Sequence, residues 1–305
     1  MQGIELCKAY YEAFGKPMLE TQFADKLHRI AVGLVGEGSE CLGYDDEISQ
    51  DHDFEPGFCL WITREDERDF GFRLERAYAK LPKTFEGFTR APLSPVGGNR
   101  HGVLVIEDFY EKFLGTPTVP QTIQQWLSIP SATLRTVVSG QVWQDDLGLF
   151  SQIREILQAG YPEDIRLKKL AAHTILMNQA GQHNLGRCLA RDEMGGAQLC
   201  IGEFVRHAIS AIYLLNNAYE PFYKWAYRGM RELPILWELE SALTSLPLSE
   251  KPEALVTEIA HSFAEAFRQQ GISDAQGDAL CSHAYAITNK ITDANIRNMH
   301  VMDGI

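Results

Sequence analysis

The sequence predicts an α+β protein, with a small mixed α/β domain at residues 1–116 followed by an all-α helical bundle at residues 117–305. Short runs rich in Ile, Val and Leu, which are typical of buried strands, occur in the first segment. After Gly115–Pro120 such runs almost disappear, and apolar residues recur at helical spacing. The length of 305 residues suits two domains of ordinary size.

The N-terminal segment is predicted to alternate between helices and strands. Apolar periodicity and turn-forming residues set the bounds of each element. In chain order we expect helices at residues 4–14 and 19–28, a buried strand at 30–35, a strand at 58–63, a charged helix at 64–81, a loop at 91–99 and a third strand at 101–109.

The C-terminal segment contains two apolar stripes with the spacing of core-facing helices. We interpret both stripes as core rather than as binding surfaces. They consist of Phe204, Ala208, Ala211, Ile212 and Leu215 in one helix, and of Leu255, Val256, Ile259, Phe263 and Phe267 in another.

Composition and charge exclude several classes of protein. The chain is 45% hydrophobic and 23% charged, and no apolar run approaches the roughly 18 residues that a transmembrane helix needs. Its N-terminus lacks the apolar core of a signal peptide. Six cysteines without a C-x-x-C pair indicate free thiols, and a net charge of −13 argues against nucleic acid as a partner. We expect a cytoplasmic protein that binds a small molecule or a protein and no membrane.

The stretch GLVGEGSECLGYDDEISQDHDFEPGFCLWI, residues 33–62, gathers many carboxylates beside a predicted strand. Side chains alternate in an extended segment, so Asp51 and Asp53 are expected on one face. Two such carboxylates, with substrate phosphates, are a ligand set for Mg²⁺. Gly38 and Ser39 lie in the turn after the preceding strand, where backbone N–H groups and a hydroxyl can approach a phosphate chain.

Three known loop motifs fit this stretch less well. A Rossmann fingerprint would have Cys41 at its third glycine position. A Walker A loop requires a lysine, and residues 27–79 contain none. A calcium loop that begins at Asp51 would have Pro56 in place of its glycine. A solvated acidic turn remains the structural alternative to a metal–nucleotide site.

A Gly-Ser turn followed at this distance by Asp-x-Asp resembles the signature of the nucleotidyltransferase superfamily, which includes DNA polymerase beta and the aminoglycoside nucleotidyltransferases. More narrowly, GEGSECLGYDDEISQDHDFEPGF resembles the opening of a bacterial family known as domain of unknown function 4037. The similarity extends to WLSIPSATLRTVVSGQVWQDDLG (126–148), AGYPEDIRLKKLAAH (159–173) and YEPFYKWAYRGMREL (219–233).

The resemblance implies a nucleotidyltransferase domain followed by a helical domain that closes over the nucleotide. Carried over residue by residue, it implies that Gly38 and Ser39 hold the triphosphate and that Asp51 and Asp53 bind Mg²⁺ and act in catalysis. The superfamily often adds a third acid on a later strand, and Glu107 is our choice for that role.

The choice of Glu107 competes with Asp108, because strand alternation lets only one of them face the site. A cation from the helical domain must supply the positive charge that the acidic stretch lacks. Lys224, between two aromatic residues, is the preferred candidate for contact with the phosphates, ahead of Arg187 and Arg228.

The expected function is Mg²⁺-dependent transfer of a nucleoside monophosphate, AMP from ATP, onto a hydroxyl of a small molecule, with release of pyrophosphate. A protein AMP-transferase or toxin–antitoxin component is an alternative in which the acceptor is a protein. A catalytically idle nucleotide-binding regulatory protein is a second alternative. The sequence predicts no oligomeric state.

Overall fold

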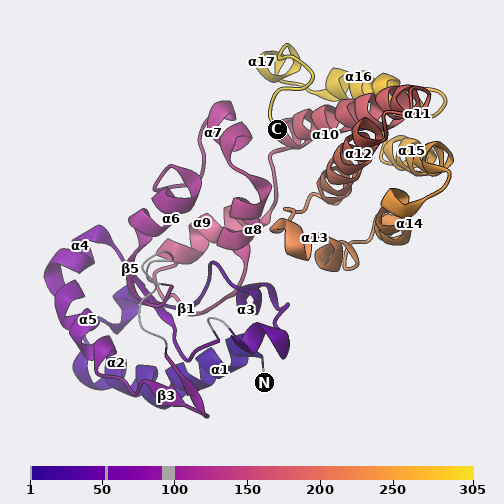
Figure 1. Cartoon of the computed structure of the whole chain (residues 1–305). Helices are drawn as coiled ribbons and strands as arrows, with labels where there is room; N and C mark the ends of the chain where they lie inside the picture. The colour runs from indigo at the N-terminus through magenta and orange to yellow at the C-terminus, as the bar shows by residue number, and fades with distance from the viewer. Residues whose placement is uncertain (1, 52–53, 91–99) are drawn as a thin grey trace. The chain divides into compact units, whose positions relative to one another are not determined.

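The computed structural model describes residues 2–51, 54–90 and 100–305, and the chain divides into two compact units (Figure 1). The first unit comprises Met1–Pro120 and Thr133–Ala159, and the second comprises Gln121–Ala132 and Gly160–Ile305. The expected mixture of α and β structure is confirmed, since a small mixed sheet occurs among many helices.

The sheet of the first unit has four short strands in the order β5-β2-β1-β6. The central strands β1 and β2 are antiparallel, β5 is parallel to β2, and β6 is antiparallel to β1. Every residue of the two central strands is buried. The strands are β1 (Ala31–Leu34), β2 (Cys59–Ile62), β5 (Gly102–Val105) and β6 (Gln141–Gln144), and a separate hairpin pairs β3 (Thr84–Phe85) with β4 (Phe88–Thr89).

Helices pack around this sheet and share its apolar core, which includes Tyr10, Leu19 and Phe58. The helices expected at residues 4–14 and 19–28 form one helical stretch over residues 3–22 with a π-helical turn at Tyr11–Gly15, so the predicted break near Gly15 and the helix end at residue 28 were wrong. The expected helix after β2 is present and has a π-helical turn at Glu67–Gly71. The α-helices are α1 (Gly3–Tyr10), α2 (Lys16–Gln22), α3 (Ser39–Leu42), α4 (Arg64–Asp66), α5 (Phe72–Ala79), α6 (Ile106–Leu114), α8 (Ser131–Val138) and α9 (Leu149–Gln158), with 3-10 turns at Leu27–Arg29 and Ile48–Asp51.

The third predicted strand is shorter than expected. The strand β5 ends at Val105, and Glu107 and Asp108 lie in the first turn of α6. Ile106 and Phe109 are buried on one face of this helix, at the i, i+3 spacing that favours a helix over a strand. Acidic residues in a first helical turn also interact favourably with the helix dipole. The strand prediction for residues 106–109 was therefore wrong.

The strand β6 lies in a segment for which we expected helical structure. It pairs with β1 where Gly33 lacks a side chain, and a Cβ atom there would collide with the backbone of Gln141 and Val142. Trp143 stacks on Tyr11 from the N-terminal helices, with ring centroids 5.6 Å apart. These partners are distant in sequence, and so the strand depends on tertiary contacts rather than on a local pattern.

The second unit is helical, and its central helix α10 packs against α12 and α16. The two predicted apolar stripes are confirmed as core, because all their residues are buried except Leu255, which is half-buried. The helices are α7 (Ile123–Ser128), α10 (Glu163–Met177), α11 (Gly186–Leu189), α12 (Met194–Leu215), α13 (Tyr223–Met230), α14 (Glu240–Ser245), α15 (Pro252–Gln269), α16 (Leu280–Lys290) and α17 (Ala294–Arg297), with a π-helical segment at Asn178–Leu185 and 3-10 turns at Trp237–Leu239 and Leu246–Leu248.

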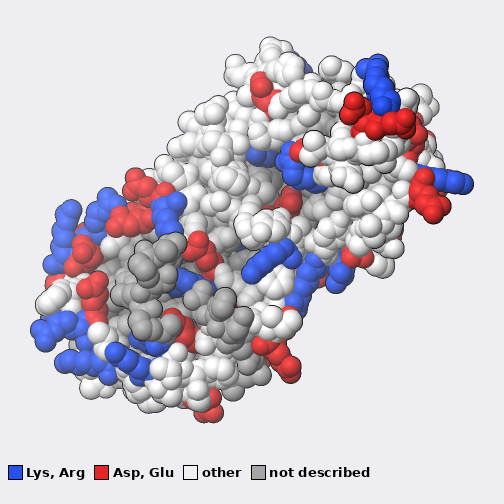
Figure 2. Space-filling view, viewed as in Figure 1, with Lys and Arg blue, Asp and Glu red and all other residues white. Residues whose placement is uncertain are grey.

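None of the helices in the described ranges is both long enough and apolar enough to cross a membrane. On the face of the first unit shown in Figure 2, Lys and Arg alternate with Asp and Glu.

Candidate functional site

The turn Gly36–Ser39 connects the buried strand β1 to the short helix α3. Gly36 and Gly38 have φ angles of 130° and 122°, which residues with side chains rarely adopt. A Cβ atom at Gly38 would also collide with the Arg100 guanidinium and the Glu40 carboxylate. Backbone conformation and close packing thus both require a glycine at position 38.

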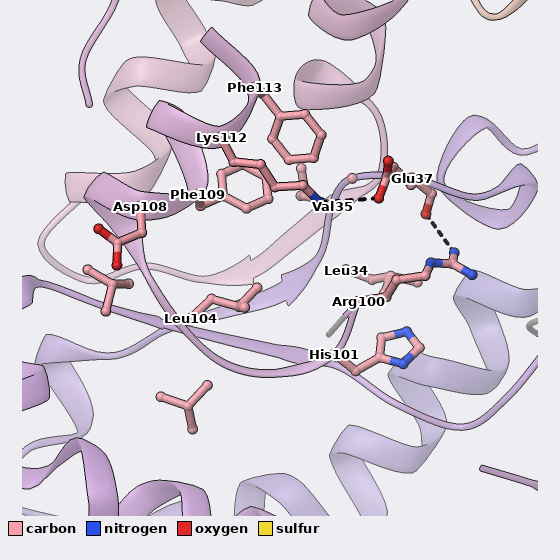
Figure 3. Close-up of a pocket in the computed structure, with 13 residues that line it drawn as sticks. Leu34, Val35, Glu37, Arg100, His101, Leu104, Asp108, Phe109, Lys112 and Phe113 are labelled. Carbon is pink, nitrogen blue, oxygen red and sulfur yellow. Dashed lines mark hydrogen bonds and ion pairs between the residues drawn. The ribbon is translucent and has the colours of Figure 1, made fainter. Parts of the chain in front are cut away.

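Arg100 holds this turn in place from a distant part of the chain. Its Nη2 atom forms an ion pair with the Glu40 carboxylate and donates a hydrogen bond of 2.6 Å to the carbonyl oxygen of Glu37, 63 positions earlier (Figure 3). The side chains of Arg100 and Glu40 are 19% and 11% exposed, so water screens the pair only weakly. The turn is therefore braced by a shielded cation.

A cavity of about 320 Å³ opens beside the turn, between residues of β1, β5 and α6 (Figure 3). This volume lies at the small end of the range for small-molecule sites, about 300–1,000 Å³. Phe109 and Phe113 form an aromatic wall of the cavity, and their ring centroids are 5.1 Å apart. Lys112 lies with its Nζ atom 4.7 Å from the centroid of the Phe113 ring and 3.4 Å from Oε2 of Glu37.

The ion pair of Lys112 with Glu37 is weak, because both side chains are more than half exposed. A ligand that carries negative charge can therefore compete with Glu37 for this lysine. The cavity combines a shielded cation, Arg100, with an exposed one, Lys112, and an aromatic wall. Such a combination suits a ligand that has both phosphate and ring groups.

His101 borders the same cavity and is buried, with its side chain 6% exposed. Its Nδ1 atom lies 3.3 Å from Oε1 of Glu55, whereas Nε2 has no hydrogen-bond partner among the described residues. A buried polar atom without a partner costs free energy. His101 therefore has one hydrogen-bonding position left for a ligand or water.

Three buried thiols lie near the turn, and burial makes them unreactive. The pKa values of Cys7 and Cys59 are raised to about 12, mainly by desolvation, and that of Cys41 is also raised by burial. Cys59 instead acts as a hydrogen-bond donor, with its Sγ atom 3.2 Å from the carbonyl oxygen of Arg100. These cysteines are thiols rather than thiolates near neutral pH and are not nucleophiles.

The two acids considered as a third catalytic residue occupy different positions. Asp108 borders the cavity and forms an ion pair with Arg64. Glu107 accepts hydrogen bonds of 3.1 and 3.3 Å from the backbone N–H of Arg64, at the start of α4. Glu107 thus joins α6 to α4, and of these two acids Asp108 is the one that borders the cavity (Figure 3).

The predicted metal ligands fall largely outside the described part of the chain. Asp51 is the last residue of a 3-10 turn, but its side chain is not described, and Asp53 lies outside the described residues. Among the residues that are described, no group of three or more His, Cys, Asp or Glu side chains forms a metal site. On the same stretch, the buried Oδ1 atom of Asp45 has no hydrogen-bond partner among the described residues, while Oδ2 accepts from the backbone N–H of Gly3 at 2.6 Å.

Lys224, the predicted phosphate ligand from the helical region, lies in α13 of the second unit. Its side chain is exposed, and its Nζ atom lies 5.0 Å from the centroid of the Trp225 ring. Gly38 and Ser39 belong to the first unit and form one turn with each other.

Sequence reasoning missed the cations at this turn, Arg100 and Lys112. Arg100 follows the predicted loop at residues 91–99, which lies outside the described residues, and it precedes a strand, which is a local signal that it lies at a sheet end. Lys112 occurs one turn after Asp108 on α6, whose first residues, 106–109, we expected to be part of a strand. A correct prediction of α6 would have placed Asp108 and Lys112 on one face.

The family model described as domain of unknown function (DUF4037) matches residues 126–226, which confirms the expected similarity to that family over this segment. The segment comprises parts of both units and does not include the turn Gly36–Ser39. Comparison with curated proteins and with solved structures found no match.

Proposed function

We propose that this protein is a Mg²⁺-dependent nucleotidyltransferase that transfers a nucleoside monophosphate, AMP from ATP, to a hydroxyl group and releases pyrophosphate. The observation that supports this function best is the glycine turn after β1, braced by Arg100 and open to a cavity with an aromatic wall. Glycine at positions 36 and 38 lets a phosphate chain approach the backbone closely.

The charges at the turn are consistent with a triphosphate ligand. Lys112 is exposed and only weakly paired, so its ammonium can bind a phosphate in place of Glu37. Arg100 is committed to Glu40 and the backbone, and it fixes the shape of the turn rather than binding the phosphate directly. A nucleotide base would pack against Phe109 and Phe113.

Mg²⁺ would be held by Asp51 and Asp53, because two carboxylates one residue apart are hard oxygen ligands of the kind this ion prefers. The Oδ1 atom of Asp45, which has no hydrogen-bond partner among the described residues, would be a further hard ligand on the same stretch. When bound, the ion would offset the charge of the phosphates and polarise the phosphorus–oxygen bonds.

In the proposed reaction the acceptor oxygen attacks the α-phosphorus, the bond to the bridging oxygen breaks, and pyrophosphate leaves with its electron pair. A carboxylate takes the hydroxyl proton, and Asp51, Asp53 and Glu107 remain the sequence-based candidates for this role. The position of Asp108 at the cavity favours it over Glu107 as a third acid. Lys112 would stabilise the negative charge that develops on the leaving group. Lys224 remains a sequence-based candidate for a phosphate contact.

The proposal is tested by isothermal titration of ATP, GTP, CTP and UTP, each with Mg²⁺, into the wild-type protein. The same titrations use a variant with Asp51→Ala and Asp53→Ala and a variant with Lys112→Met. Glu47→Ala is the matched control, because Glu47 is an exposed acid on the same stretch. We expect metal-dependent binding of one triphosphate, which the first variant loses, Lys112→Met weakens at least tenfold and the control retains.

Pyrophosphate release in the presence of hydroxyl acceptors, small molecules and proteins, then separates the three functional alternatives. Release with a small molecule supports the main proposal, and labelling of a protein supports an AMP-transferase. Binding without release under all these conditions indicates a regulatory nucleotide-binding protein. If no triphosphate binds to the folded wild-type protein, the nucleotidyltransferase proposal is wrong.

A further inference from the structure

A second cavity, of about 470 Å³, lies entirely within the second unit. Its walls come from the end of α7 and the residues that follow it, from α10 and α12, and from residues 220–223, which lead into α13. Its volume is within the range of about 300–1,000 Å³ that is typical of small-molecule sites. All its lining residues except Ile305 fall within residues 126–226, the segment that matches the family model.

Lys169 of α10 is a buried cation at this cavity, only 7% exposed. Its Nζ atom donates hydrogen bonds of 3.0 Å to the carbonyl oxygen of Leu127 and 2.9 Å to that of Gly304. Burial lowers the pKa of Lys169 to about 8, so the ammonium remains largely charged at pH 7. An ammonium has three N–H groups, and the described residues provide hydrogen-bond acceptors for two of them, while the Nζ atom also lies 5.8 Å from the centroid of the Tyr161 ring.

A chain of hydrogen bonds next to Lys169 determines which nitrogen of His173 carries a proton. The Nη2 atom of Arg206 lies 3.1 Å from Nε2 of His207, and a guanidinium can only donate, so this Nε2 accepts. The Nδ1 atoms of His207 and His173 are 2.9 Å apart, and so His207 donates and His173 accepts there. Burial lowers the pKa of both imidazoles, that of His207 to about 4, and therefore both rings are neutral.

The consequence for His173 is a proton on Nε2, the nitrogen that does not face His207. His173 borders the cavity, and its Nε2–H has no partner among the described residues. This assignment requires that Nε2 of His207 accept from Arg206 rather than donate to Glu203, whose Oε2 atom lies 3.3 Å away and also accepts from Arg206 at 2.7 Å. The Nζ atom of Lys169 and the Nε2 atom of His173 can thus each donate a hydrogen bond to a ligand in the cavity.

The remaining lining is mostly apolar, with one acid. Glu220 accepts a hydrogen bond of 2.5 Å from the hydroxyl of Ser210, and its backbone N–H donates to Oγ of Ser131 at 2.7 Å. Burial raises the pKa of Glu220, which reduces its negative charge. The apolar wall includes Leu127, Ile129, Tyr213, Leu214 and, at 53% exposure, Phe222.

We propose that this cavity binds a small molecule that has a carboxylate or phosphate group on an apolar body. The anionic group accepts hydrogen bonds from Lys169 and His173, and the nearby guanidinium of Arg206 adds positive charge at the mouth. The apolar body lies against Ile129 and Phe222. This site is independent of the proposed nucleotide site, because all its residues belong to the second unit.

Four probes test the proposal by isothermal titration into the full chain: phenyl phosphate, benzoate, benzyl alcohol and inorganic phosphate. The signal of His173 in the imidazole region of the NMR spectrum reports where they bind, and His173→Gln identifies it. We expect saturable binding of phenyl phosphate or benzoate, at least tenfold tighter than that of benzyl alcohol or inorganic phosphate, with a shift of the His173 signal. The tighter of the first two shows whether the natural anion is a phosphate or a carboxylate.

Three variants complete the test. Lys169→Met removes the buried ammonium, and Arg206→Gln removes an exposed guanidinium that is paired with a glutamate. Arg231→Gln is the matched control, since Arg231 is equally exposed, is also paired with a glutamate and does not line the cavity. We expect Arg206→Gln to weaken binding at least fivefold and the control to bind as wild type, even if Lys169→Met fails to fold. Failure of all four probes to shift the His173 signal, or unchanged affinity in Arg206→Gln, overturns the proposal.

Discussion

Replacement of Arg100 by methionine should destabilise the first unit strongly, because it leaves the Glu40 carboxylate buried without a cation. The side chain of Glu40 is 11% exposed and is paired with the guanidinium of Arg100. Removal of one partner from a buried ion pair costs about 3–5 kcal/mol, whereas replacement of both partners by apolar residues is often nearly neutral. We therefore expect Arg100→Met to lower the free energy of unfolding by about 3–5 kcal/mol, and the double variant with Glu40→Leu to recover most of that loss.

The assay is urea unfolding followed by circular dichroism, with Arg68→Met as the control. Arg68 is an exposed arginine of the same unit, and its replacement should change the free energy of unfolding by less than about 0.5 kcal/mol. A loss below about 1 kcal/mol in Arg100→Met, or a double variant as unstable as the sum of the single variants, would show that Arg100 does not hold the turn through Glu40.

Two further predictions follow from buried ionisable groups. Because the pKa of Lys169 is about 8 in the folded chain and 10.5 in the reference state, the unfolded chain binds more protons between these values. The free energy of unfolding should therefore rise with pH more steeply in wild type than in Lys169→Met, by up to about 1.4 kcal/mol per pH unit. Urea unfolding at pH 7.5 and 9.5 measures this difference, and an equal change with pH in both proteins would contradict it. Burial raises the pKa of Cys59 to about 12, so a thiol reagent at pH 8 should label the half-exposed Cys188 and leave Cys59 unmodified in the folded chain, as mass spectrometry of the digested protein would reveal.

Local patterns in the sequence were enough to predict the central strands of the sheet, the helix after β2 and the two core stripes of the second unit. The strands at residues 30–35 and 58–63 and the two stripes, one with Phe204 and the other with Phe263, are visible because burial on one or both faces sets the spacing of apolar residues. The strand Gln141–Gln144 was missed, since it is short, has polar ends and depends on its pairing with β1. The helix α6 was missed because an apolar strand runs directly into it without a turn residue.

The candidate site shows the same limit. Gly38 and Ser39 were found because a glycine turn after a buried strand is a local signal. Arg100 approaches that turn from 63 positions away, and no spacing in the sequence indicates such a contact. The donor on His173 is still less accessible to sequence reasoning, because it depends on hydrogen bonds through His207 to Arg206.

The order of segments in the two units affects how this chain can be divided in the laboratory. The polypeptide runs from the first unit into the second, returns to the first and then enters the second again, where it stays to residue 305. These crossings lie at residues 120/121, 132/133 and 159/160. A fragment that ends near residue 120 would lack β6 and leave one edge of β1 unpaired, and an unpaired strand edge promotes aggregation. A fragment of residues 126–226 would contain one strand of the sheet without its partner. Fragments for expression should therefore contain both segments of each unit, and shortening is best attempted at surface loops within a unit.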